Sequence, residues 1–194
     1  WLDIPLEFQW ADIKYKLNKK KENNKKYNQK INEFLKLLKK SKKPLITIGY
    51  GVRSSKDTIS NLKKIISKYK MPFTTTWNGS DIFSTNHNLN LGIIGMSGQR
   101  GANKAMFEAD LILCFGTHLS IPHTTTLFDS YAKQAKKIIV NIDKNQLNNL
   151  NVKFDLKINC DLELFFKTLL KKKLNFNNEW RNLNQIKQLN WYEP

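Results

Sequence analysis

The sequence predicts a doubly wound α/β domain, and three observations support that fold class. Short apolar runs that suit buried strands alternate with longer segments whose apolar residues recur at helical spacing. A glycine-rich stretch enters one of the helical segments, and polar loops follow the apolar runs. Short strands that alternate with helices are typical of a parallel sheet with both faces covered. We therefore expect a mostly parallel, Rossmann-like sheet of about five or six strands with helices on both faces.

The first half of the chain supplies two helices and two strands. Residues 31–40 carry apolar side chains at helical spacing, which predicts a helix. Residues 45–48 form an apolar run that ends at a glycine turn, as a buried strand would. Ser54 or Ser55 is placed to cap a second helix, and the Thr-rich run 73–77 that follows it is expected to be a strand.

The second half continues the alternation of strands and helices. Strands are expected over 111–115, 138–142 and 154–158, where short apolar runs lie between turn residues. A short helical stretch is expected over 131–136, and Asp161 is placed to cap the last helix of the domain. These elements complete the repeating pattern of a parallel sheet.

The composition limits the class of protein. Across 194 residues the formal net charge is +17, and the basic excess is almost entirely Lys, because Arg occurs only at positions 53, 100 and 181. Proteins that bind nucleic acid usually rely on Arg and interleaved aromatic residues, so we assign the Lys to solvated helix faces and expect no nucleic-acid partner. No apolar run approaches the roughly 20 residues that span a bilayer, so we do not expect a membrane protein.

The two cysteines bear on the redox compartment of the protein, and the first residues bear on whether the chain is part of a longer protein. Cys114 and Cys160 occur in apolar or strand-like surroundings, which favours two buried thiols in a reducing cytoplasm. The chain does not begin with Met, and its first residues resemble a buried strand and its exit. We therefore expect a piece of a longer protein.

The most distinctive stretch runs from Gly92 to Ala105. Four glycines fall within its first ten residues, and a helix-compatible run up to Glu108 follows. Such a turn leaves backbone N–H groups free at a helix N-terminus, where the helix dipole favours a phosphate or diphosphate. The alternative is a tight loop that needs glycine for its dihedral angles and binds nothing.

Other loops are expected to join this stretch at one edge of the sheet. Ligands of open parallel sheets lie in the crevice beyond the carboxyl ends of the strands. The loops at those ends cover residues 49–55, 77–81, 116–126 and 143–146, and they carry Gly, Asp, Thr and amide side chains. Their convergence predicts a binding edge.

A series of short motifs occurs in a specific order: Trp1-Leu-Asp-Ile-Pro-Leu6, Gly49-Tyr-Gly-Val52, Thr74-Thr-Thr-Trp-Asn-Gly79, Gly92-Ile-Ile-Gly-Met-Ser-Gly98, Ala109-Asp-Leu-Ile-Leu113 and Val140-Asn-Ile-Asp143. Together they resemble the central domain of thiamine-diphosphate enzymes of the acetolactate synthase type. By this resemblance, residues 1–13 are the tail of a preceding pyrimidine-binding domain and 14–30 are a linker. Residues 31–172 are the central domain, and 173–194 are a linker toward the diphosphate-binding domain.

The resemblance also implies a division of labour between domains. In this family the first and third domains bind thiamine diphosphate and Mg²⁺ between two subunits, and the central domain is structural. The intact protein would then be a homodimer or homotetramer that decarboxylates a 2-oxo acid and passes the two-carbon unit to an acceptor. This chain lacks the family's metal-binding Gly-Asp-Gly motif, so we expect no catalytic and no metal-binding residue in it.

The central domain of some family members holds FAD or an ADP-containing molecule. The positions of this chain that match such a site are Gly49, Gly51, Val52, Gly95, Met96, Gly98, Arg100, Asp143 and Lys144. Arg100 would pair with a diphosphate or with a carboxylate across a subunit interface. Asp143 would accept a hydrogen bond from a ribose hydroxyl or cap the next turn.

One loop departs from the flavin-binding members. They usually carry a run like Arg-Phe-Asp-Asp-Arg after the third strand of the central domain, whereas this chain has Thr117-His-Leu-Ser-Ile-Pro-His-Thr-Thr125. That loop looks more like acetolactate synthase relatives encoded with surface-polysaccharide biosynthesis, whose acceptor would be a sugar or another aldehyde.

Other interpretations remain open. The two alternatives to the family assignment are a stand-alone NAD-using α/β domain and a basic nucleic-acid-binding module. Cys114, His118 and His123 match no standard zinc spacing, and we interpret them as structural. Ser120, His123 and Asp129 have the residue types of a hydrolase triad but lack a nucleophile elbow, so we set that function aside.

Overall fold

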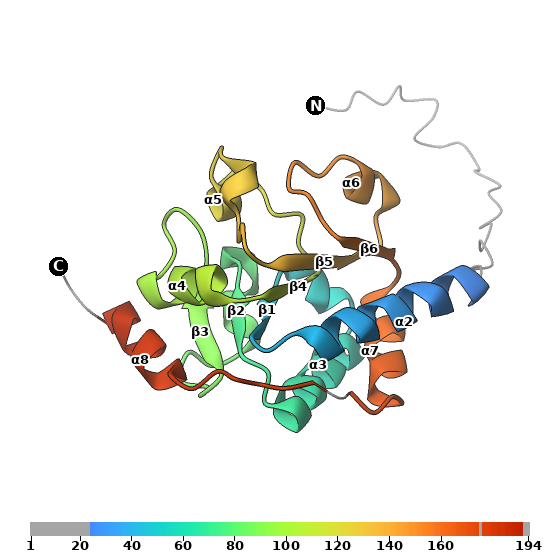
Figure 1. Ribbon diagram of the computed structural model, residues 1–194, viewed down its shortest axis with the longest axis horizontal. Helices are drawn as coiled ribbons and strands as arrows, with labels where there is room; N and C mark the ends of the chain where they lie inside the picture. The colour runs from blue at the N-terminus through green and yellow to red at the C-terminus, as the bar shows by residue number, and fades with distance from the viewer. Residues whose placement is uncertain (1–23, 175, 192–194) are drawn as a thin grey trace, which may run out of the picture.

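The computed structural model describes residues 24–174 and 176–191, which contain a six-stranded parallel sheet in the order β3-β2-β1-β4-β5-β6 (Figure 1). The chain begins the sheet in its middle, at β1, and winds outward in both directions, which confirms the doubly wound α/β fold. The strands are β1 (Pro44–Ile48), β2 (Phe73–Thr75), β3 (Asn90–Ile93), β4 (Leu111–Phe115), β5 (Lys136–Asn141) and β6 (Leu156–Asn159).

Helices connect the strands and cover the sheet. The α-helices are α2 (Asn24–Lys40), α3 (Lys56–Tyr69), α4 (Arg100–Glu108), α5 (Ile121–Thr124), α6 (Lys144–Asn148), α7 (Leu162–Leu170) and α8 (Leu183–Gln188). Short 3₁₀ helices are η1 (Tyr50–Ser54), η2 (Trp77–Ile82), η3 (Phe128–Ser130) and η4 (Leu189–Trp191). Two caps form as the sequence predicts: Ser55 Oγ accepts the N–H of Thr58 at 3.1 Å, and Asp161 Oδ1 accepts the N–H of Glu163 at 2.7 Å.

Alternate residues of the strands pack on opposite faces of the sheet. On one face Ile46, Leu113 and Ile138 lie among side chains of α2, α3 and α7. On the other face Ile112 and Ile139 pack with α4, α8 and the segment before β5. Because both faces are buried, the strands are continuously apolar, which made them recognisable in the sequence.

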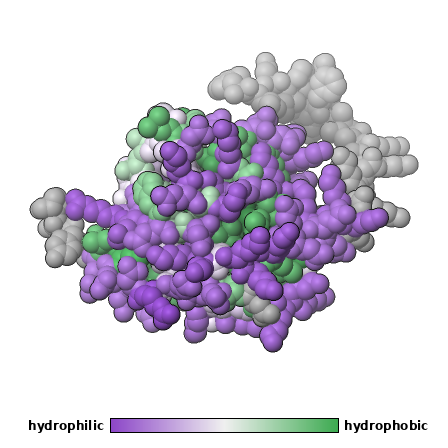
Figure 2. Space-filling view, in the orientation of Figure 1, coloured by the Kyte–Doolittle hydropathy of each residue, from purple (hydrophilic) through white to green (hydrophobic). Residues whose placement is uncertain are grey.

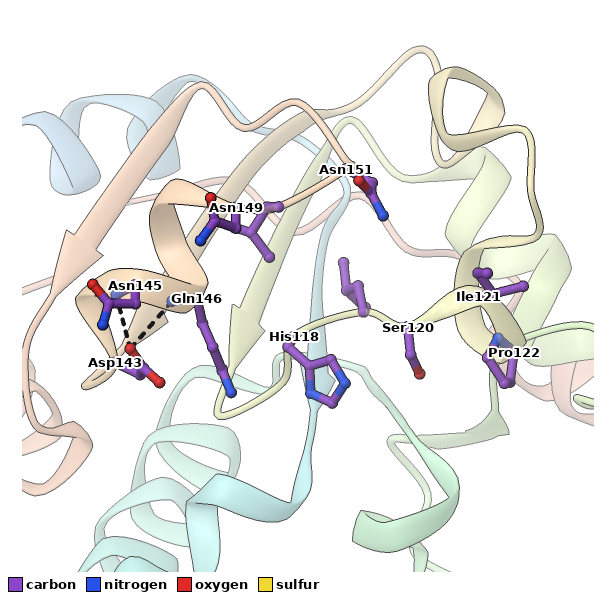
Figure 3. Close-up of a pocket in the computed structure, with 11 residues that line it drawn as sticks. His118, Ser120, Ile121, Pro122, Asp143, Asn145, Gln146, Asn149 and Asn151 are labelled. Atoms are coloured by element: carbon purple, nitrogen blue, oxygen red, sulfur yellow. Dashed lines mark hydrogen bonds between the residues drawn. The ribbon is translucent and has the colours of Figure 1, made fainter. Parts of the chain in front are cut away.

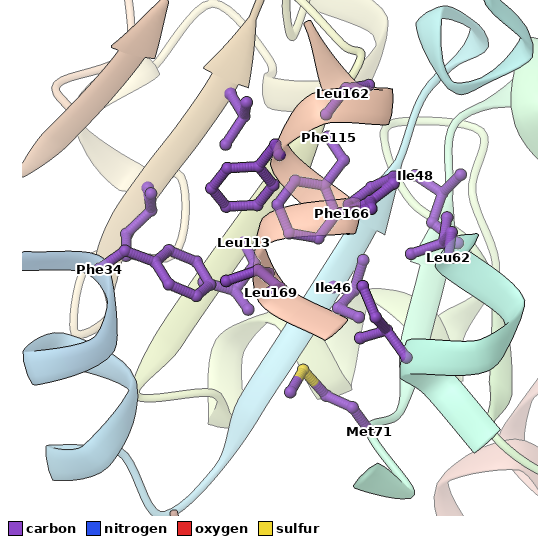
Figure 4. Packing of buried hydrophobic residues seen from close by; sticks show 14 of the residues in the cluster. Phe34, Ile46, Ile48, Leu62, Met71, Leu113, Phe115, Leu162, Phe166 and Leu169 are labelled. Carbon is purple, nitrogen blue, oxygen red and sulfur yellow. The ribbon is translucent and has the colours of Figure 1, made fainter. Parts of the chain in front are cut away.

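The face covered by α2, α3 and α7 holds the first core, and the opposite face holds the second core. Aromatic rings fill the first core. Phe115 of β4 meets Phe166 of α7 at 5.1 Å between ring centroids, and Phe34 of α2 meets Phe165 edge-on at 5.2 Å. Figure 4 shows Phe34, Phe115 and Phe166 converging between the helices and the sheet. Pairs of this kind stabilise the domain beyond the free energy of burial alone, by about 1 kcal/mol each.

Two local predictions differ from the structure, and one strand was not predicted. The helix expected from residue 31 begins at Asn24, so residues 24–30 of the predicted linker form its first turns; Tyr27 OH donates to Thr168 Oγ1 at 3.2 Å and anchors them. The helical stretch expected over 131–136 is a turn, and Lys136 already belongs to β5. The edge strand β3 was not predicted, because Gly92 interrupts a run of only four residues.

The C-terminal segment, which we define as residues 177–191, is packed against the domain. Trp180 is buried, and its Nε1–H donates to the carbonyl of Pro44 at 2.9 Å. Ile186 of α8 is fully buried in the second core. The predicted tail, residues 1–13, and residues 14–23 of the predicted linker lie outside the described residues.

The visible face of the molecule is mostly hydrophilic, with smaller hydrophobic areas near α5 and across the middle (Figure 2). In the described ranges, none of the helices has both the length and the apolar character needed to cross a membrane. Both cysteines are buried, as predicted, and burial raises the pKa of the Cys114 thiol to about 12.

Candidate functional site

The loops that follow the strands meet at the carboxyl edge of the sheet. Backbone hydrogen bonds join the loop after β1 to the loop after β4, from Gly49 N to Phe115 O and from Gly51 N to Gly116 O, both 2.9 Å. The glycine stretch joins the same edge, because Met96 N donates to Pro122 O at 2.8 Å. The predicted convergence of these loops is therefore present in the structure.

The N–H groups of the glycine stretch are largely used within the protein. Gly95 N donates to Asn103 Oδ1 at 3.0 Å, Gly98 N to Gly95 O at 3.0 Å, and Gln99 N to Ile93 O at 2.7 Å. At the start of α4, Gly101 N donates to Asn190 Oδ1 at 2.7 Å. These groups do not form an open cradle for a phosphate, so the structure favours the tight-loop interpretation of this stretch.

Asn103 holds the turn of the glycine stretch from the side of α4. Its Oδ1 accepts the N–H of Gly95 and its Nδ2 donates to the carbonyl of Gly95 at 2.9 Å. Gly95 has φ +118°, and a Cβ there would lie 2.2 Å from Pro122 O. Glycine is required at this position, because it both turns the chain and lets the loop after β4 approach.

A cavity with a volume of about 590 Å³ lies at the carboxyl edge, between the loop after β4 and α6. Figure 3 shows His118, Ser120 and Pro122 on one wall and Gln146 and Asn149 on the other. Leu119, Ile121 and Leu150 add apolar surface. Apolar surface with amide groups suits a planar, polar ligand such as a nucleoside.

Asp143 is the predicted site residue that lines this cavity. Its Oδ1 accepts the N–H groups of Asn145 at 2.8 Å and Gln146 at 3.1 Å, so it caps α6 (Figure 3). Among the described residues, none donates a hydrogen bond to its Oδ2. The predicted capping role is confirmed, and one carboxylate oxygen remains available to a ligand.

The other predicted site residues are distributed around the edge and do not line this cavity. Val52 is fully buried in the first core, so its side chain is structural. Arg100 and Lys144 are exposed at the first positions of α4 and α6. Gly49, Gly51, Gly95, Met96 and Gly98 belong to the joined loops described above.

Ser120 and His123 interact with each other, but not as part of a triad. Ser120 Oγ and His123 Nδ1 lie 3.1 Å apart at the start of α5. Burial, followed by the charge of His118, lowers the pKa of His123. Asp129 instead pairs with Lys153 at 3.5 Å. In the described part of the chain, no three His, Cys, Asp or Glu side chains are grouped as a metal site.

Exposed apolar side chains accompany the cavity along the carboxyl edge. One follows each of β1 to β5: Tyr50, Trp77, Met96, Ile121 and Ile142. Tyr50, Met96 and Ile142 are each more than 60% exposed, at 63%, 67% and 68%. Apolar side chains gathered at one edge are typical of a surface that meets a ligand or another protein surface.

Sequence reasoning identified the loops of this site but missed several of its residues. Asn149 and Asn151 line the cavity from the segment after α6, which carried no motif. Asn103 and Asn190 fix the glycine stretch through contacts with Gly95 and Gly101. An amide side chain alone does not show which distant backbone group it binds, so the sequence held no signal for these roles.

Known proteins share sequence similarity with this chain over much of its length. Residues 31–169 match the family described as thiamine pyrophosphate enzyme, central domain. The chain is 35% identical over 136 residues to the 3D-(3,5/4)-trihydroxycyclohexane-1,2-dione hydrolase of Clostridium tetani, covering 69% of this chain and 21% of that protein. It is 33% identical over 144 residues to a probable acetolactate synthase large subunit of Methanococcus aeolicus, covering 74% and 24%.

A third relative matches over more of the chain. The acetolactate synthase large subunit of Lactococcus lactis is 32% identical over 181 residues, which cover 89% of this chain and 30% of the relative. The chain thus spans less than a third of the length of the relatives it matches. The fold, the order of the motifs and the match over residues 31–169 show that this chain belongs to the family of central domains of thiamine-diphosphate-dependent enzymes.

Proposed function

We propose that this chain is the scaffold domain of a larger enzyme that decarboxylates a 2-oxo acid and transfers the resulting unit to an acceptor. The family match over residues 31–169 carries this proposal, and the acetolactate synthase relatives support it. When bound, thiamine diphosphate supplies the electron sink for such chemistry, with Mg²⁺ at its diphosphate. The residues of this chain would orient and support the domains that hold both groups.

The specific reaction is a further part of the proposal. The Clostridium tetani relative is named for hydrolysis of a cyclic dione and not for carboligation. Hydrolysis of such a dione is therefore a second candidate for the intact enzyme. A direct comparison of pyruvate with a cyclic dione as substrate of the full-length protein separates the two.

The cavity beside α6 is proposed to hold the nucleoside part of FAD or of an ADP-containing molecule. The free Oδ2 of Asp143 suits a ribose hydroxyl, and the amides of Gln146 and Asn149 suit a base. The diphosphate would rely on exposed side chains such as Arg100 and Lys144, because the N–H groups of the glycine stretch are engaged.

Nucleotide binding is testable on the 194-residue chain. Visible flavin absorbance is recorded on the purified chain, and thermal unfolding is followed with FAD, ADP, NAD and coenzyme A. A ligand that binds only the folded state raises the unfolding temperature. We expect FAD or ADP to raise it. If none of these nucleotides changes it, the cavity is not a nucleotide site and the domain is a scaffold alone.

A pair of matched variants locates the site. Asp143→Asn keeps the oxygen that caps α6 but removes the negative charge, so stability stays within about 0.5 kcal/mol of the original while ADP or FAD affinity falls about tenfold. Asp161→Asn makes the same change at the cap of α7, away from the cavity. Calorimetric titration of both variants with the nucleotide measures the difference. Equal affinities in the two variants would remove Asp143 from the site.

We also propose a cytoplasmic homodimer or homotetramer for the intact protein. The burial of both cysteines supports a reducing compartment. The apolar carboxyl edge supports contact with a further domain or subunit. The comparisons do not favour a stand-alone NAD-using domain or a nucleic-acid-binding module.

A further inference from the structure

A second, smaller cavity lies at the other end of the carboxyl edge. It has a volume of about 130 Å³ and is bordered by the ends of β2 and β3 and by the C-terminal segment. Thr75, Thr85, Gln99, Lys187 and Asn190 are among its lining residues, and it shares no lining residue with the cavity beside α6. Its volume exceeds the roughly 30 Å³ that one water molecule occupies in the liquid, so a small polyatomic group fits.

The C-terminal segment forms a fixed wall of this cavity. Asn190 Oδ1 accepts the N–H of Gly101 at 2.7 Å, and Asn190 Nδ2 donates to the carbonyl of Leu91 at 2.8 Å. The close approach depends on Gly101, where a Cβ would lie 2.1 Å from the carbonyl oxygen of Ile186. The wall is therefore held by contacts with both β3 and α4.

The cavity lining offers hydrogen-bond donors, whereas several of its acceptors are already engaged. Gln99 Oε1 accepts the N–H of Ile93 at 3.0 Å, which leaves the amide NH₂ of Gln99 without a protein partner among the described residues. The side-chain carbonyl oxygens of Asn90 and Asn190 accept hydrogen bonds from backbone N–H groups. Lys187 Nζ donates to the carbonyl of His87 at 3.0 Å and has two further N–H groups.

The charges around the cavity are positive. In the described part of the chain, no carboxylate lies within ion-pairing distance of Lys187, and burial lowers its pKa. The pKa of His87 is lowered by burial and then by the charges of Lys187, Lys70 and Lys63. A partly desolvated ammonium without a counter-charge is stabilised when an anion binds beside it.

From this arrangement we infer that the cavity binds a small oxyanion, either inorganic phosphate or a carboxylate group, between the ammonium of Lys187 and the amide of Gln99. The hydroxyl groups of Thr75 and Thr85 are further donors in the lining. Because Lys187 belongs to the C-terminal segment and Gln99 precedes α4, the anion bridges the two. Anion binding thus stabilises the docked position of the C-terminal segment.

The test measures thermal unfolding and calorimetric binding of the 194-residue chain with potassium phosphate or potassium acetate. Potassium chloride keeps the ionic strength constant, which separates specific binding from general screening. We expect a saturable rise in unfolding temperature with at least one of the two anions. A response to phosphate alone identifies a phosphate site, and a response to acetate identifies a carboxylate site.

Variants connect the response to the cavity. Lys187→Met removes the ammonium, and Gln99→Glu keeps the oxygen that binds Ile93 N while it replaces the donor by a negative charge. Each is expected to weaken anion binding about tenfold or more. Lys64→Met, on the exposed face of α3, is the control and leaves affinity unchanged. The inference is overturned if neither anion acts beyond chloride, or if all three variants bind as the original chain does.

Discussion

Single amide and imidazole side chains determine how the carboxyl edge is held. Asn103 binds both the N–H and the carbonyl of Gly95, at 3.0 and 2.9 Å, and so fixes one residue of the glycine stretch from α4. Met96 then donates to Pro122 O and connects that stretch to the loop after β4. Asn103 is therefore a positioning residue for the edge, since it acts through the backbone that it holds.

Replacement of Asn103 tests this role. Asn103→Ala leaves the N–H of Gly95 without its partner and removes one of the two donors to the carbonyl of Gly95, and we expect the free energy of unfolding to fall by about 2 kcal/mol. Asn148→Ala is the control, because Asn148 is exposed in α6 and its side chain has no hydrogen bond within the described residues. Urea unfolding followed by circular dichroism measures both. Similar losses in the two variants would show that Asn103 does not hold the loop.

His87 makes stability depend on pH. Its ring packs against Phe73 and Phe83, its Nδ1 accepts the N–H of Leu89 at 3.2 Å, and its pKa is lowered from 6.5. The unfolded imidazole binds a proton more readily, so this stabilising contribution is complete above the unfolded pKa and is lost as pH falls through the folded pKa. We therefore expect the free energy of unfolding to decrease between about pH 7 and pH 5.

Substitution separates the histidine contribution from other effects. His87→Gln retains an acceptor for Leu89 N but cannot take up a proton, so the loss between neutral and acidic pH becomes smaller, although stability is lower at every pH. His123, whose pKa is also lowered, accounts for part of the remaining loss. Asn88→Gln, at the next residue, changes the same exposed loop without an ionisable group. An unchanged pH dependence in His87→Gln would contradict this explanation.

The roles of polar residues were predictable from the sequence where these residues bind backbone groups close to them in the chain. Asp143 and Asp161 cap the helices that follow them, and a cap binds N–H groups two or three residues away. Asn190 binds Gly101, which is 89 residues away in sequence. No local pattern marks a partner at that distance, so the engagement of the glycine stretch by the C-terminal segment could not be predicted.

At the scale of helices and strands, the C-terminal segment completes the domain. Trp180 lies under the start of β1, where its Nε1–H donates to Pro44 O, and Lys43 Nζ lies 5.5 Å from the centre of its ring. Glu179 N also donates to Lys42 O at 2.7 Å. These contacts hold the segment across the amino end of β1, before α8 packs on α4.

Trp180→Phe tests this docking. Phenylalanine retains most of the apolar surface but removes the donor to Pro44 O, so we expect the free energy of unfolding to fall by about 1 kcal/mol. Trp77→Phe, at a position 46% exposed on the carboxyl edge, is the matched control and is expected to change stability by less than about 0.5 kcal/mol. Urea unfolding measures both variants. A loss confined to Trp77→Phe would show that the segment is not anchored through Trp180.

Strand and helix prediction succeeded where burial gives a simple pattern. The apolar runs at β1, β4 and β5 were recognisable because each lies between two covered faces. The start of α2 was missed because residues 24–30 are rich in Lys and Asn, and Tyr27 provides their main apolar contact. The helix predicted over 131–136 was wrong because Ala132 adopts a φ of 44°, which interrupts a helix.

On the scale of the whole molecule, the surface is rich in lysine, and exposed apolar side chains occur at the carboxyl edge. Of the sequence, 33 residues are Lys or Arg and 16 are Asp or Glu, and lysines such as Lys36 and Lys64 lie on exposed helix faces. Several exposed apolar residues follow the strands at the carboxyl edge, although Phe107 on α4 and Leu164 on α7 are exposed elsewhere. This edge is the surface best suited to meet a nucleotide or a neighbouring domain.

The family assignment leads to one comparison for the whole protein. Full-length protein and the 194-residue chain are each incubated with thiamine diphosphate, Mg²⁺ and pyruvate, and CO₂ release is followed. We predict that the full-length protein releases CO₂ and that the 194-residue chain does not, because in the proposed function the chain supports the domains that perform the chemistry. Turnover by the chain alone, or no CO₂ from pyruvate or any other 2-oxo acid with the full-length protein, would contradict this account.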